Sequence, residues 1–119
     1  MSMDFTIARR MEDGSWWHGH HDAAFNVANA TGYAIMRAIG IEPDTCGSID
    51  GADAYARAVA FRAVGDPAEH AVAGFDTRGE AGCRTISMGV PAERIAARMA
   101  QFEELARIAA AEGAHVGWS

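Results

Sequence analysis

The stretch from Pro91 to Glu112 constrains the fold more than any other part of this chain. Apolar side chains recur there at the period of a helix, namely Ile95, Met99, Phe102, Leu105, Ala106 and Ala109. Proline suits the first position of a helix, and Gly113 suits the residue just past its end. An apolar stripe of this width must be buried against another layer of structure. The pattern therefore predicts a long amphipathic helix packed on the core.

Four stretches are predicted to be strands. Residues 3–11 alternate with a period of two, which is typical of a half-buried strand. Residues 70–76 and 83–89 flank a glycine-bearing connection at 77–82 and are expected to form a hairpin. Residues 114–118 are predicted to be a short final strand. In the first strand, the side that includes the core-facing Phe5 carries Met3, Phe5, Ile7, Arg9 and Met11.

Two shorter helices are predicted between the first strand and the hairpin. The first covers residues 30–39, and Asn29 is expected to be its N-cap. The second begins after a cap at Ser48 or Asp50 and ends near Val64. The side of the second helix that is expected to face the core carries Ala52, Tyr55, Ala56, Val59 and Ala63.

The order of these elements defines the expected fold. With residues 15–25 and 41–47 as loops, the order is β–α–α–β–β–α–β, and merging the short helices gives βαββαβ. This is the ferredoxin-like order, in which helices cover one face of a four-stranded antiparallel sheet. A length of 119 residues suits one domain with its own core. We therefore expect residues 1–119 to form a single α+β domain of the ferredoxin-like class.

The composition is that of a folded protein with an acidic surface. Half of the residues are hydrophobic and 22% are charged, and the net charge of −6 comes from sixteen acids and ten arginines. Nucleic-acid binding is not expected, because it depends on neutralising phosphates. The strand at 83–89 also lacks the aromatic residues of RNA-binding sheets. Abundant alanine, glycine and arginine without any lysine indicate a GC-rich bacterial or phage genome.

The expected location is the cytoplasm. The first ten residues lack the apolar segment of a secretory signal, and no stretch reaches the roughly 20 apolar residues of a membrane-spanning helix. Two cysteines, Cys46 and Cys83, are too few for a disulfide framework and are expected to be free thiols. Nothing in the sequence places either thiol beside a histidine.

A histidine-rich segment follows the first strand. His18 and His20 are two residues apart, so an extended backbone would place both imidazoles on one side, where they could bind zinc. His21 and Asp22 could add further ligands. The alternative is a solvated loop that its neighbouring tryptophans anchor to the core. The segment also resembles the metal-binding signature of metallo-β-lactamase-like hydrolases, but Ala23 stands where the last histidine is required.

Three segments carry a resemblance to small bacterial and phage proteins of unknown function. They are Phe25–Ala30, the helix that follows Pro91, and the ending Gly113–Trp118. The resemblance implies one domain of bacterial or phage origin and assigns no activity.

These observations favour a non-enzymatic interaction module without a cofactor. We expect it to form a homodimer or to bind a protein partner, as a regulator or an inhibitor, without contact to nucleic acid or membrane. A zinc-binding protein or minimal metal hydrolase at His18, His20 and His21 is one alternative, and a small-molecule-sensing ferredoxin-like domain is another. The surface expected to bind lies opposite the helices and carries small or weakly polar residues, namely Thr6, Ala8, Thr85, Ser87 and His115.

Overall fold

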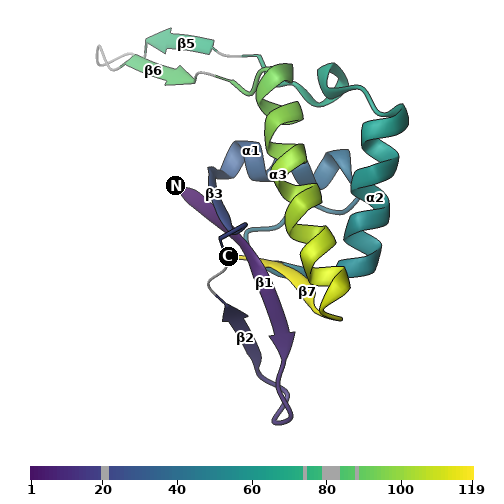
Figure 1. Ribbon diagram of the computed structural model, residues 1–119. Coiled ribbons are helices and arrows are strands. Elements are labelled where there is room, and N and C mark those ends of the chain that lie inside the picture. The colour runs from purple at the N-terminus through teal and green to yellow at the C-terminus, as the bar shows by residue number, and fades with distance from the viewer. Residues whose placement is uncertain (20–21, 74, 79–83, 88) are drawn as a thin grey trace.

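The computed structural model describes residues 1–19, 22–73, 75–78, 84–87 and 89–119, and it has the expected α+β composition (Figure 1). The elements in chain order are β1 (Ser2–Arg10), β2 (Trp16–Gly19), β3 (Phe25–Ala28), α1 (Asn29–Ala38), β4 (Gly47–Asp50), α2 (Gly51–Val64), the short 3₁₀ helix η1 (Pro67–His70), β5 (Phe75–Arg78), β6 (Arg84–Ser87), α3 (Ala92–Ala111) and β7 (His115–Trp118).

Strand β1 is the centre of the main sheet, and every pairing in that sheet is antiparallel. The first half of β1 pairs with β3 and its second half with β2, so these two strands follow one another along the same edge of β1. On the other edge β1 pairs with β7, and β7 pairs in turn with β4. The strand order β2-β1-β7-β4 makes β7 an interior strand. The short final strand expected at 114–118 is therefore confirmed as β7, and it lies in the interior of the sheet.

The hydrophobic core lies on one face of this sheet, under the helices. The alternation expected for β1 is confirmed, because Met3, Phe5 and Ile7 are all buried. The helix expected at 91–112 is confirmed as α3, and all six residues of its apolar stripe are buried. Phe102 of α3 packs edge-on against Phe5, with 5.8 Å between ring centroids. The remaining strand residues of the core face the same way, namely Val27, Val116 and Trp118.

The ferredoxin-like topology is not confirmed. Strands β5 and β6 pair with each other as a hairpin, but β5 begins at Phe75 and not at residue 70, which belongs to η1. The two strands form a separate two-stranded sheet that projects from the body (Figure 1). Their connection at 79–83 lies outside the described residues. The loops expected at 15–25 and 41–47 instead contain or lead into β2, β3 and β4, which complete the main sheet. Each of these strands has only four residues, too few to show a clear period in the sequence.

The two shorter helices are confirmed, with corrections at their ends and faces. Asp50 is the N-cap of α2, where its side chain accepts from the backbone amide of Asp53. Asn29 is not the N-cap of α1. That position belongs to Ala28, which has no side-chain acceptor to offer. The prediction of which face of α2 is buried is also wrong, because the buried residues are Gly51, Ala54, Ala58 and Phe61.

The structure is more extended than is typical of a domain of this length. Its radius of gyration is 15.8 Å, whereas about 13.5 Å is typical for this length. Two hairpins account for the difference: β5–β6 at one end, and β1–β2, which runs past the helices at the other (Figure 1). None of the described helices is long and apolar enough to cross a membrane.

Candidate functional site

The histidine-rich segment begins as strand β2 and not as a loop. His18 pairs across the sheet with Ala8, so its side chain lies on the face opposite the core. Its Nδ1 lies 3.4 Å from Oγ1 of Thr6. The imidazole covers Gly117, where an added Cβ would lie 3.0 Å from Cε1 of His18. Because His18 lies in a strand, its backbone is extended, as the zinc hypothesis requires.

The other predicted zinc ligands do not join His18 among the described residues. His20 and His21 lie outside the part of the chain that the structure describes. Asp22 lines a separate cavity together with Gln101 and Glu104 of α3. Within the described ranges no three histidine, cysteine, aspartate or glutamate side chains come together as a metal site. The zinc hypothesis stays a prediction that depends on His20 and His21.

The face of the sheet opposite the helices differs from the expected surface. Thr85 and Ser87 belong to β6, in the separate hairpin, and do not contribute to it. Ala8 is fully buried although it points away from the core. His115, which pairs across the sheet with Ala8, is partly buried. The described part of this face is therefore only partly the surface of small, weakly polar residues that the sequence predicts.

A cleft of about 190 Å³ lies on this face beside His18. It brings the exposed thiol of Cys46 and the hydroxyl of Ser48 to the same cleft as the imidazole of His18. The sequence alone could not place the thiol there. Cys46 and His18 share no hydrogen bond in the described structure, and Cys83 lies outside it. The remaining lining residues are Trp16, Gly47, Trp118 and Ser119.

Two neighbouring tryptophans are the most exposed aromatic side chains of the β1–β2 hairpin. Trp16 is 38% exposed and Trp17 is 49% exposed, and Met11 at the turn is 48% exposed. The Trp16 ring packs edge-on against His115, at 5.0 Å between centroids, and under the guanidinium of Arg10, at 5.8 Å. These contacts hold Trp16 in place, so it does not have to be ordered when it meets a partner.

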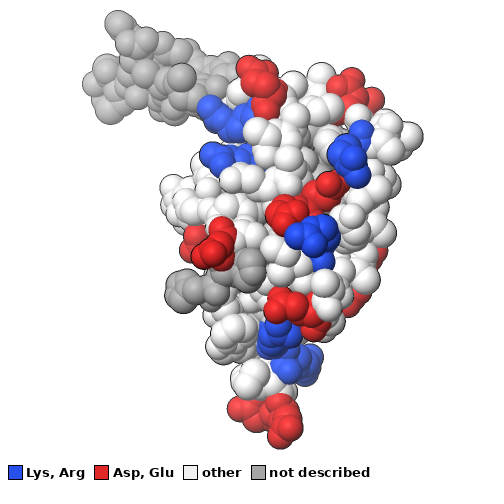
Figure 2. Space-filling model, in the orientation of Figure 1, with Lys and Arg blue, Asp and Glu red and all other residues white. Residues whose placement is uncertain are grey.

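Charges of both signs follow one another along the hairpin. Arg9 joins it to the end of α3 by an ion pair with Glu112, at 3.1 Å. Glu12 and Asp13 lie at the turn, and Figure 2 shows acidic side chains at that end of the molecule with basic ones directly above them. Hydrogen bonds from the hydroxyl and the amide of Ser15 hold the pKa of Asp13 below its ordinary value. Asp13 therefore stays ionised to a lower pH than an ordinary aspartate.

No family model, no curated protein and no solved structure matches this chain.

Proposed function

We propose that this chain is a non-enzymatic interaction module that forms a two-fold homodimer through the β1–β2 hairpin. The observation that carries the proposal is the pair of exposed tryptophans, Trp16 and Trp17, on a hairpin that extends beyond the helices. Tryptophan is enriched at protein interfaces and among the residues that contribute most to binding. An exposed ring loses little entropy on binding when it is already packed against its own chain.

Strand β2 offers a main-chain edge next to these rings. Its described residues pair with β1 on one side only. Edge strands usually carry lysine, proline or a bulge that blocks pairing with another chain, and Trp16–Gly19 contains neither lysine nor proline. Two β2 strands related by a two-fold axis can pair antiparallel and join the two main sheets. A two-fold dimer is the commonest closed assembly.

The charges of the hairpin are complementary to themselves under such an axis. Arg10, Glu12 and Asp13 lie close together at the turn of the hairpin, so each copy offers charges of both signs for contacts with the other. These contacts guide the orientation of the pair more than they raise its affinity. They also offset part of the repulsion that opposes dimerisation of a chain with a net charge of −6.

The proposed module keeps the layering of ferredoxin-like domains, with helices on one face of an antiparallel sheet and the other face open to partners. We place its action in the bacterial or phage-infected cytoplasm, where an exposed free thiol such as Cys46 stays reduced.

Replacing Trp17 tests the dimer. Trp17→Ala is expected to raise the dissociation constant of the homodimer at least thirtyfold, or about 2 kcal/mol, as for a central interface residue. Sedimentation velocity over a concentration series measures this constant. Val64→Ala is the matched control, because Val64 is an apolar residue that is 88% exposed on α2, away from the hairpin. A wild-type protein that stays monomeric at the highest concentration, or equal constants for both variants, would contradict the proposal.

A further inference from the structure

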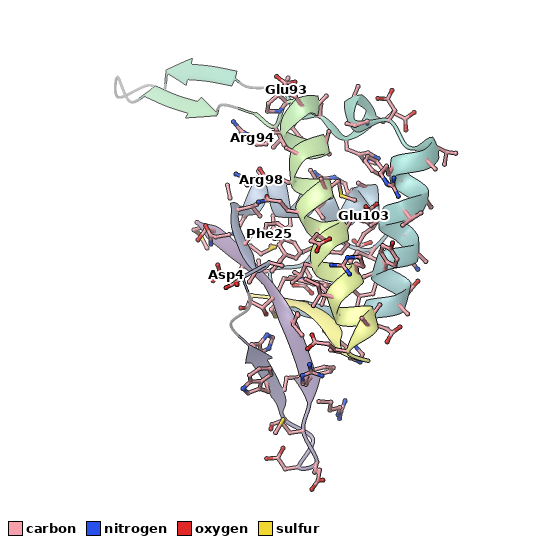
Figure 3. The ribbon with its side chains drawn as sticks, in the orientation of Figure 1. Asp4, Phe25, Glu93, Arg94, Arg98 and Glu103 are labelled. Atoms are coloured by element: carbon pink, nitrogen blue, oxygen red, sulfur yellow. The ribbon has the colours of Figure 1, made fainter. Side chains whose placement is uncertain are left out.

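A second cavity lies away from the hairpin, where α3 passes β3 and the start of α1. Its volume is about 320 Å³. Figure 3 shows Arg94 and Arg98 on the side of α3 that faces β3 and α1. The residues that line the cavity are Asn26, Val27, Ala28, Thr31, Arg94 and Arg98, and none of them is acidic.

Arg94 and Arg98 are two of the four arginines, among the eight whose side chains the structure describes, that have no carboxylate partner there. Arg94 donates to the carbonyl of Gly89 at 3.5 Å, and Arg98 donates to Oε1 of Gln101 at 2.7 Å. Both acceptors are neutral. Two guanidinium groups without a carboxylate partner therefore line one cavity whose described lining has no acidic residue. The arginines that do form ion pairs with a carboxylate are Arg9, Arg57, Arg62 and Arg107.

The start of α1 adds to the positive potential of this cavity. Its N-cap, Ala28, has no side-chain acceptor, and the first turn of the helix contains no acid. The amide of Asn29 is bonded to the carbonyl of Met1, at 3.2 Å, but no side chain caps the next amides. Thr31 of this turn lines the cavity and is almost fully buried. The helix end and the arginines therefore act on the same space.

We propose that this cavity binds the phosphate group of a small phosphorylated molecule. A guanidinium donates two parallel hydrogen bonds to phosphate oxygens, and two arginines one helical turn apart can hold a dianion from one side. The amides of the first turn of α1 can donate to the remaining oxygens from the other side. The cavity is larger than a phosphate ion, so it has room for a small organic group attached to the phosphate.

Titration with inorganic phosphate and with phenyl phosphate tests this site. At constant ionic strength, both are expected to shift the amide NMR signals of Ala30, Thr31 and Gly32 in a saturable way. Phenyl phosphate should bind more tightly if the cavity takes the organic group as well, and equally if it takes the ion alone. Acetate is the control for a monoanion. The double variant Arg94→Gln/Arg98→Gln should raise the dissociation constant at least tenfold.

Arg10→Gln is the matched control, because Arg10 also lacks a carboxylate partner in the described structure but lies on the hairpin. It should leave phosphate binding unchanged. Trp17→Ala should also leave it unchanged, which separates this site from the proposed dimer. The proposal is overturned if the first-turn amides do not move, if acetate shifts them as strongly, or if the double variant binds with wild-type affinity. If the double variant does not fold, the titration of the wild type decides. Amide shifts that are spread over the whole surface, and not concentrated at Ala30, Thr31 and Gly32, would then overturn the proposal.

Discussion

Phe102→Ala is expected to lower the free energy of unfolding by about 3–5 kcal/mol. Phe102 is fully buried and meets the edge of Phe5, which itself stacks on Phe25 at 5.2 Å and lies 6.1 Å from the ring of Trp118. Truncation removes one ring of this cluster and leaves a cavity between α3 and the sheet. A domain of this size typically has a free energy of unfolding of about 5–15 kcal/mol, so the variant loses a large part of its stability.

Urea unfolding followed by circular dichroism measures the change, provided that wild type and variant have the same slope with urea. Val64→Ala serves here too as the control, because it removes methyl groups from a side chain that is already in water. It should change the stability by less than about 0.5 kcal/mol. A Phe102→Ala variant as stable as Val64→Ala would contradict the packing of α3 on β1.

The parts of the fold that the sequence predicted correctly are those in which several signals agree. In α3 the apolar period, the proline before it and the glycine after it all indicated the same helix. Gly113 has a φ of 64°, the left-handed backbone for which glycine was expected. In β1 the strand is long enough for its alternation to be visible. The local sequence determines such elements, so they can be predicted without knowledge of tertiary contacts.

The parts that were missed depend on contacts between distant segments. Strands β2, β3 and β4 are identified by their pairing with β1 and β7, which no local period reveals in four residues. The buried face of α2 was misjudged because alanine occurs on several of its sides, so that hydrophobicity does not distinguish them. Ala58 is buried and Ala52 is exposed, although they are chemically identical.

The candidate sites show the same division. Trp16, Trp17 and His18 can be selected from the sequence, which leaves open a zinc site at the histidines or a loop that the tryptophans anchor to the core. Arg94 and Arg98 gave no signal, because the absence of a carboxylate partner is a property of the folded chain. Ala28 gave no signal either, because the sequence indicates Asn29 as the N-cap and only the structure shows Ala28 in that position.

Gly51→Ala is expected to destabilise the protein by about 3 kcal/mol, at the upper end of the usual cost of overpacking. Gly51 is the first residue of α2, and its amide donates to the carbonyl of Ala114 at 3.0 Å. An added Cβ would lie 2.6 Å from the oxygen of Ala114, 2.7 Å from the nitrogen of Ala110 and 2.8 Å from the carbonyl carbon of Ala109. These are all backbone atoms, so no change of rotamer can relieve the contact.

The variant must therefore move α2 away from the corner between α3 and β7, which also strains the pairing of β4 with β7. Gly113→Ala separates this effect from the loss of backbone freedom. At Gly113 no atom lies within 4 Å of an added Cβ, and the only penalty is the left-handed backbone, about 1–2 kcal/mol. Urea unfolding of both variants gives the comparison. If Gly51→Ala lowered the free energy of unfolding no more than Gly113→Ala, the close packing of α2 against the end of α3 would be contradicted.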